Sequence, residues 1–236
     1  MVAAMRNLFL ADLIVRSVLP IGDRQMADEP TEETRDQRYD RQTKEQFELL
    51  GRFVQAFELM VFEVRRGCIH LTTSGVDHQS LMNRVFHHSA LSAQPLFDIL
   101  SALITAIVVE LSPKIDPDQR TTTLGVLKQL RTNFKDLVER RNKLLHGTWF
   151  IGWANPAATD FSKTSVMNLK WTAEGELKPP PLKGADDLKQ LTSKCADMAH
   201  MILSLVMCIH LTGGPRVCQN FQKQNGRWIT TIQRVE

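Results

Sequence analysis

The sequence lacks the paired cysteines that mark disulfide scaffolds and structural zinc sites. Its four cysteines stand far apart, with no Cys-x-x-Cys pair among them: Cys68, Cys195, Cys208 and Cys218. We therefore expect free thiols and a cytoplasmic protein, because thiols stay reduced in such a compartment. The sequence also has no glycine-rich phosphate loop, no serine nucleophile elbow and no internal repeat. These absences argue against P-loop nucleotide hydrolases, α/β-hydrolases and solenoid proteins.

No uninterrupted apolar run is long enough to cross a bilayer. Residues 1–19 are mostly apolar, but Arg6, Asp12 and Arg16 interrupt them, and no clean signal-peptide core with a cleavage site follows. Two interpretations stay open, an amphipathic docking helix or a true start at Met26. Residues 26–42 mix both charge signs with almost no apolar side chains, so we expect a solvated linker there.

A large excess of one charge is also missing. The 29 basic and 26 acidic residues give a net charge of +3, with a pI near 8.7. This balance is too mild to indicate a nucleic-acid partner by itself. The 236 residues are 43% hydrophobic, which is enough for one large domain with appendages.

Apolar residues recur at spacings of three and four in long segments, which predicts amphipathic helices. The segments cover about residues 43–71, 81–111, 122–145 and 185–211. Phe53 and Met60 widen the stripe of the first segment, which consists of Phe47, Leu50, Val54, Phe57, Val61, Val64, Cys68 and Leu71.

Pro95 interrupts the second of these segments. Proline removes a backbone donor and clashes with the preceding turn, so we expect a kink or a new helix with Pro95 in its first turn. Residues 96–111 are apolar nearly all round. Such a helix is buried on most sides, either at the centre of a bundle or in a subunit interface.

Alternating apolar residues replace the helical pattern after the third helix. Trp149, Trp153 and Trp171 fall on the apolar sides of two short runs, which predicts a small β-hairpin at about 148–172. We expect these tryptophans to pack on the helices rather than to stack on bases. The tail adds at most a short strand at 228–232.

The predicted fold is therefore mainly α. It is an antiparallel helical bundle of four to five core helices over residues 43–212, with the small hairpin inserted before the last long helix. An extension and linker precede it at 1–42, and a tail follows at 213–236.

The third helix places an arginine in its apolar stripe. The stripe contains Leu127, Leu130, Phe134, Leu137 and Leu144, and the position seven residues past Phe134 is Arg141. An arginine on a core-facing side is costly unless its charge is paired or opens onto a polar pocket. Gly147 then ends the helix, as glycine does at a left-handed C-cap.

Arg141 is followed by Asn142 and, after three more residues, by His146. In one interpretation His146 caps the helix and Arg141 pairs with a carboxylate such as Glu58, Glu63 or Asp98. In the other, the arginine binds a phosphate and the histidine moves a proton. Arg141 and His146 lie about 140° apart around the helix, whereas Asn142 and His146 share a face. A chemical site would therefore need two copies of the helix, as in a symmetric dimer.

Spacing alone is weak support, because Arg65 and His70 match it too. That match contains Gly67 and has no amide beside its arginine. A metal site is not expected: His78, His87 and His88 lack the helical spacing of a metal pair.

The phrase ERRNKLLHG at 139–147 resembles the signature of the HEPN superfamily, with Arg141, Asn142 and His146 at the defining positions. HEPN proteins are all-helical domains of prokaryotic toxins, abortive-infection proteins and CRISPR-linked RNases. The resemblance covers the helical framework at about 43–211, but only this short motif is specific. The hairpin and the N-terminal extension do not map onto the family.

The resemblance implies a metal-independent, cofactor-free endoribonuclease that works as a homodimer on RNA, as a toxin or antiviral effector. His146 would be the general acid or base, Arg141 would hold the scissile phosphate, and Asn142 would orient the phosphate or the histidine. Arg140 and Lys143 would flank the site as contacts to the RNA backbone. An antitoxin or a regulatory protein is a further expected partner. The alternative is an inactive HEPN-like module that binds RNA or protein as a scaffold.

Overall fold

The computed structural model describes residues 33–72, 85–87, 91–109, 115–146, 185–212 and 217–232. The chain divides into two units after Thr34, and the fold described below belongs to the unit that begins at Arg35. The expected hairpin at about 148–172 and the two interpretations of the N-terminal segment lie outside the described residues.

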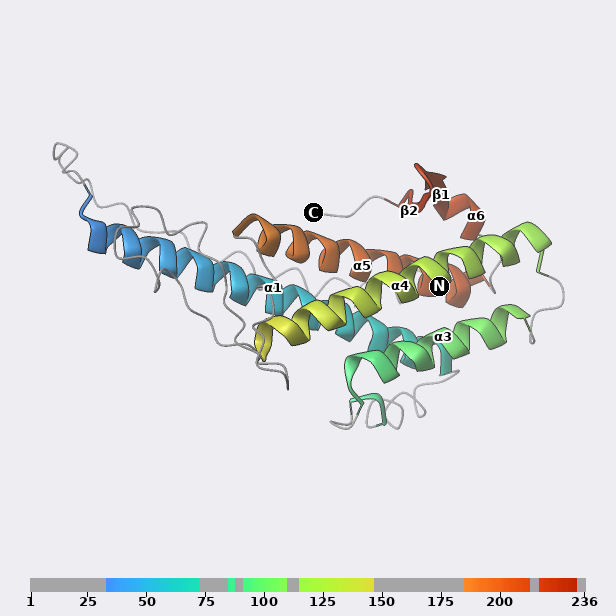
Figure 1. The fold of residues 1–236 in the computed structure, drawn as a ribbon. Coiled ribbons are helices and arrows are strands. Elements are labelled where there is room, and N and C mark those ends of the chain that lie inside the picture. Colours follow the sequence, from blue (N-terminus) through green and yellow to red (C-terminus); the bar gives the residue numbers. More distant parts are fainter. Residues whose placement is uncertain are drawn as a thin grey trace, which may run out of the picture. The chain divides into compact units, whose positions relative to one another are not determined.

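Four long helices form most of this unit: α1 (Arg35–Thr72), α3 (Ala93–Val109), α4 (Pro117–Leu145) and α5 (Ala185–Thr212) (Figure 1). The prediction of a mainly helical fold is confirmed. Helix α1 packs chiefly against α5, and α3 packs against both α1 and α4. The short helix α6 (Val217–Asn220) leads into a hairpin of β1 (Phe221–Gln224) and β2 (Arg227–Thr230).

Helices α1, α3 and α5 run in one direction, and α4 runs in the opposite direction (Figure 1). Gly67 of α1 faces Val206 of α5, and the rings of His70 and His210 lie 5.4 Å apart. The ends of α1 and α5 therefore lie together, and an antiparallel arrangement is wrong for this pair. Because α4 alone reverses the chain direction, its C-terminal end lies beside the beginning of α3.

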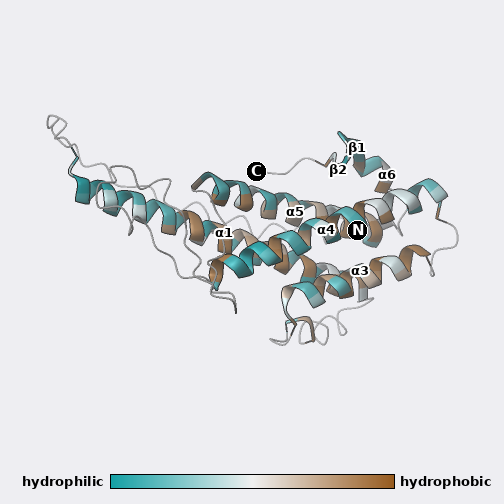
Figure 2. Cartoon of the chain, viewed as in Figure 1, coloured by the Kyte–Doolittle hydropathy of each residue, from teal (hydrophilic) through white to brown (hydrophobic). Residues whose placement is uncertain are grey.

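Helix α1 begins earlier than its apolar pattern indicates. Residues 35–42, predicted as part of a linker, are helical and mostly exposed. Arginine and glutamine favour helix, and a helix satisfies its backbone hydrogen bonds internally, so α1 can extend into solvent. Figure 2 shows this hydrophilic first part of α1. For residues 35–42 the predicted solvation is confirmed, and the prediction of a linker is wrong because they belong to α1.

Large aromatic side chains fill the core. Phe53, Phe97 and Phe134 are fully buried, and the rings of Phe97 and Phe134 stack with their centroids 4.5 Å apart. The stripe of α1 is rotated from the predicted one, since Phe53 and Met60 are fully buried while Phe47 is 53% exposed. The buried face also contains Gln46 and Gly67. The spacing of apolar residues therefore cannot place these two residues on the buried face of α1.

Helix α3 starts at Ala93, with Pro95 in its first turn, so the prediction of a new helix is confirmed. One side of α3 is buried, through Leu96, Phe97, Leu100, Ser101, Ile104 and Val108. Asp98 and Ala102 on the other side are exposed. A central position is therefore wrong, because α3 packs on α1 and α4 from one side. A role of its outer side in a subunit interface stays a prediction.

The C-terminal hairpin docks on α4. Asn225 (φ 50°) and Gly226 (φ 78°) form its two-residue turn, as expected for an Asn-Gly hairpin turn. The carboxamide of Gln129 pairs with β2 as a neighbouring strand would: it donates to the Trp228 carbonyl at 2.8 Å and accepts from the Trp228 N–H at 2.7 Å. The predicted short strand near 228–232 is confirmed in part.

Helix α5 buries its whole predicted apolar stripe, which consists of Leu188, Leu191, Cys195, Met198, Ile202, Leu205 and Ile209. By length and composition alone, Ala185–His210 could span a bilayer, with a mean hydropathy of 1.2. Half of its most apolar 18 residues are buried inside the fold. Packing against α1 and α4 accounts for the buried residues of this helix.

The described cysteines are buried and form no disulfide with one another: Cys68, Cys195 and Cys208. Burial raises the pKa of Cys68 and of Cys195 to about 12. Both therefore stay protonated near neutral pH, and they behave as small apolar core residues.

Alanine at Gly51 and at Gly67, both within α1, should change stability in opposite directions. Alanine favours helix over glycine by about 0.5–1 kcal/mol, and nothing lies within 4 Å of a Cβ at Gly51. At Gly67 a Cβ would lie 2.9 Å from Val206 Cγ2 and 3.1 Å from Leu100 Cδ1, and overpacking costs about 1–3 kcal/mol. Urea denaturation should show a higher free energy of unfolding for Gly51→Ala and a lower one for Gly67→Ala. Equal stability of the two variants would contradict this close helix packing.

Candidate functional site

A cleft of about 360 Å³ lies where the end of α4 meets α1 and the beginning of α3. Arg141 and Asn142 of the predicted site line it, and His146 does not. Val138 of α4 lines it as well. The other lining residues are Phe57, Glu58, Val61 and Arg65 of α1, and Leu91, Ser92, Ala93 and Gln94 at the start of α3.

Arg141 is held in this cleft by three weak contacts. Its guanidinium carbon lies 5.6 Å from the centre of the Phe57 ring, its Nη2 lies 3.6 Å from Glu58 Oε1, and its Nη1 donates to Asn142 Oδ1 at 3.3 Å. The Nε of Arg141 is buried and has no hydrogen-bond partner in the described part of the chain. The guanidinium is therefore oriented, but its donors are only partly used.

The pairing of Arg141 with a carboxylate is confirmed for one of the three candidates, Glu58. The pair is weak, because its atoms are 3.6 Å apart and the Glu58 side chain is 51% exposed. Exposed ion pairs stabilise a fold by about 0–1 kcal/mol. The other two candidates have different partners: Glu63 pairs with Arg66 at 2.8 Å, and Asp98 accepts from Gln94 at 3.2 Å.

Arg65 is a second arginine of the cleft. The sequence offers no signal for it beyond the repeated arginine-histidine spacing, which is weak support by itself. Among the described residues Arg65 makes no ion pair, and its Nε is buried without a hydrogen-bond partner. Its place beside Arg141 depends on how α1 packs against α4, which no local pattern encodes.

His146 lies outside the cleft, at the end of α4. Its side chain is exposed, and its backbone N–H donates to the Asn142 carbonyl at 3.1 Å, in the C-cap position. The capping interpretation of His146 is thus confirmed for the backbone. The imidazole ring, one turn beyond Asn142, remains accessible to a ligand or to another chain.

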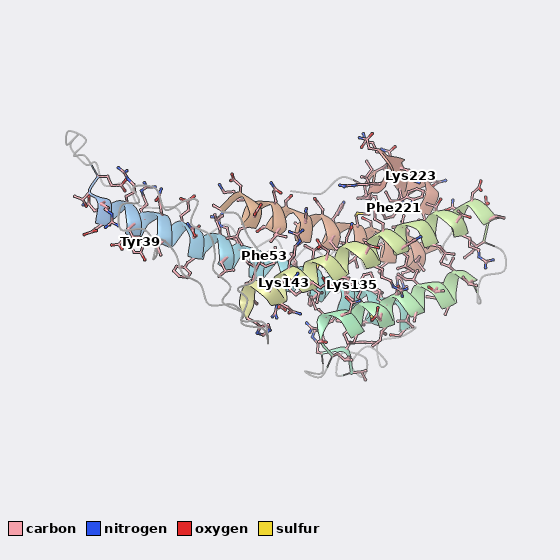
Figure 3. The ribbon with its side chains drawn as sticks, in the orientation of Figure 1. Tyr39, Phe53, Lys135, Lys143, Phe221 and Lys223 are labelled. Carbon is pink, nitrogen blue, oxygen red and sulfur yellow. The ribbon has the colours of Figure 1, made fainter. Side chains whose placement is uncertain are left out.

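The two predicted flanking residues lie on the outer side of α4. Arg140 Nε pairs with Asp136 at 3.0 Å, and both side chains are about half exposed. Lys143 is exposed near the C-terminal end of α4 (Figure 3). Neither residue lines the cleft, so a contact with a ligand there would be peripheral.

The histidine of the second match lies apart from the cleft. His70 sits beside His210, and burial lowers the pKa of His70, with smaller contributions from the neighbouring His210 and Arg66 charges. The structure therefore separates the residues of this match. Arg65 faces the cleft with Arg141, while His70 packs near the end of α5.

The donor set of the cleft suits an anion. Arginine forks bind phosphate or carboxylate groups in bidentate fashion, and of the lining residues that the structure describes, two are arginines and one is a carboxylate. Within the described ranges no group of three or more His, Cys, Asp or Glu side chains could hold a metal ion. Comparison of the chain with protein-family models, curated proteins and solved structures found no match.

Protonation of His70 should destabilise the fold as the pH falls. Because folding lowers the pKa of His70 below 6.5, the unfolded chain binds this proton more readily. The contribution of His70 to stability is therefore complete above pH 6.5 and is lost as the pH falls through the lowered pKa. As the pH falls below 6.5, the free energy of unfolding measured in urea should decrease less for His70→Gln than for the matched variant His146→Gln. Equal losses would contradict the assignment.

Proposed function

We propose that the chain is a metal-independent endoribonuclease of the HEPN type, active as a symmetric dimer. The observation that carries the proposal is the placement of Arg141 and Asn142 in an anion-suited cleft, with the accessible imidazole of His146 one turn away. Phosphate binding and proton transfer are the two tasks that RNA cleavage demands, and these side chains supply both.

The proposed reaction uses the ribose 2′-hydroxyl as the nucleophile. His146 accepts the proton of this hydroxyl while water protonates the leaving 5′-oxygen, or His146 protonates the leaving 5′-oxygen while water accepts the hydroxyl proton. The 2′-oxygen forms a bond to phosphorus as the bond from phosphorus to the 5′-oxygen breaks. Arg141 stabilises the negative charge that develops on the phosphate, and Asn142 orients the arginine through its bond to Nη1. The products are a 2′,3′-cyclic phosphate and a 5′-hydroxyl.

A second copy of the chain completes the proposed site. Within one chain His146 does not reach the cleft that holds Arg141, and the two residues project about 140° apart around α4. Two α4 ends related by a twofold axis would place the His146 of each copy at the cleft of the other. In this proposal the protein is a cytoplasmic toxin or antiviral effector, restrained by an antitoxin or a regulatory protein.

The weak pair of Arg141 with Glu58 favours a second candidate function. A cleft whose arginine is already oriented by Phe57 and Glu58, with the histidine outside it, can bind an RNA or protein anion without cutting. The chain would then be an HEPN-like binding or scaffold module. Defined cyclic-phosphate ends after incubation with RNA would exclude it.

Purified protein should cleave single-stranded RNA in the presence of EDTA and leave DNA intact, because DNA lacks the nucleophile. His146→Ala should lower the rate by about 10²–10⁴, the usual contribution of a general acid or base. Arg141→Ala should lower it by about 10²–10³, through lost charge stabilisation. Arg52→Ala, on the exposed side of α1, is the control and should cut at the wild-type rate. Wild-type cleavage by His146→Ala would rule out the proposed mechanism.

Mixing two inactive variants tests the shared site. In a heterodimer of Arg141→Ala with His146→Ala, one site keeps both residues and the other site loses both. The mixture should therefore recover cleavage, up to half of the wild-type activity per heterodimer. Light scattering should report dimers for each variant. An inactive mixture that contains heterodimers would show that each site takes both residues from one chain.

A further inference from the structure

We infer that the cleft binds a ribose phosphate unit of single-stranded RNA, with its phosphate between Arg65 and Arg141. Arg65 is then a substrate-binding residue on a different helix from the Arg141 motif. The inference rests on the proposed function, in that RNA is the substrate. It adds where the RNA backbone lies and which further side chain holds it.

The charges in the cleft favour a phosphate group. Among the described residues, two guanidinium groups and one carboxylate, that of Glu58, line it, which leaves one net positive charge. Glu58 holds Arg141 only at 3.6 Å, and no described carboxylate pairs with Arg65. A phosphate with two free oxygens can therefore accept from both arginines, each of which offers several N–H groups in a fixed plane.

Unmade hydrogen bonds point to a ligand rather than to a structural role. The Nε atoms of Arg65 and Arg141 are both buried without a partner among the described residues. A buried donor that makes no hydrogen bond is costly, and such groups are few in native proteins. These two donors without a partner, Arg65 Nε on α1 and Arg141 Nε on α4, line the same small cleft.

The beginning of α3 adds to the attraction for an anion. Ser92, Ala93 and Gln94 line the cleft, and the Ser92 carbonyl accepts the N–H of Leu96 at 3.2 Å. The first N–H groups of a helix have no acceptor within the helix itself. Their partial positive charge favours a phosphate beside them, and the arginines face the same space.

Gln94 indicates why the ligand carries a ribose. Its Nε2 donates to Asp98 at 3.2 Å, which fixes the orientation of the amide, because a carboxylate only accepts. The Oε1 of Gln94 is then an acceptor, and it is buried with no partner in the described part of the chain. Phosphodiester oxygens cannot donate to it, whereas a ribose 2′-hydroxyl can. The cleft thus offers donors for a phosphate and an acceptor for a sugar hydroxyl.

Binding of a short fluorescein-labelled single-stranded RNA tests this assignment. The full-length chain would carry His146→Ala in every arm to prevent cleavage, and circular dichroism would confirm folding. Arg65→Gln should raise Kd at least about tenfold, as the loss of a charged hydrogen bond does. It should also reduce the slope of log Kd against log salt by about 0.7, the value for one phosphate contact on a single strand. Glu58→Gln should tighten binding, because it removes the competing carboxylate.

Arg52→Gln is the matched control, since it makes the same charge change on the same helix at an exposed ion pair. If Arg65→Gln and Arg52→Gln have equal effects on Kd, the inference is overturned. Equal binding of a labelled single-stranded DNA of the same sequence overturns the ribose contact. Binding of inorganic phosphate without RNA identifies a free-anion site instead. Cleavage by the chain with an intact His146 is measured separately. RNA binding that depends on Arg65 without any cleavage defeats the proposed function and leaves this inference standing.

Discussion

The position of Arg141 within the apolar stripe of α4 is the constraint on which the site depends. Phe134, Leu137 and Leu144 are buried on this face of α4 and pack it against the core. The arginine on the same face therefore cannot turn fully to solvent. Its guanidinium must find polar surroundings at the edge of the core, because an unpaired buried charge is too costly. Phe57, Glu58 and Asn142 meet that requirement only in part. The cleft beside it is therefore polar and suited to an anion.

Helix direction supplies the rest of the cleft. Because α4 runs against α1 and α3, its C-terminal end meets the beginning of α3 and the middle of α1 (Figure 1). Arg65 comes into the cleft by this packing, and the close approach of α1 to α5 at Gly67 fixes that part of α1. His146 lies beyond the packed part of α4, free of the core. The same geometry that orients the arginines leaves the histidine exposed, as the proposed shared site requires.

Periodicity predicted the four long helices and the burial of α4 and α5, because apolar residues make up most of their buried faces, which also contain Thr123 and Ser204. It misjudged α1, where Gln46 and Gly67 are part of that face, and it missed that charged residues extend the helix to Arg35. The Asn225-Gly226 pair is a hairpin signal contained in the local sequence, because both residues accept a positive φ. The sequence pattern could not predict that Arg65 lines the same cleft as Arg141. That placement depends on packing between helices that are distant in sequence, and the same holds for the parallel course of α1 and α5.

The central claim is that an RNA phosphate lies at Arg141 while a histidine from a second chain reaches it. A crystal structure of the protein with an uncleavable RNA dinucleotide analogue measures this most directly. The account predicts the phosphate between Arg65 and Arg141, with the His146 imidazole of another copy within about 2.6–3.2 Å of the sugar oxygen or the leaving oxygen. A phosphate bound elsewhere, or dimers whose His146 rings point away from both clefts, would contradict it.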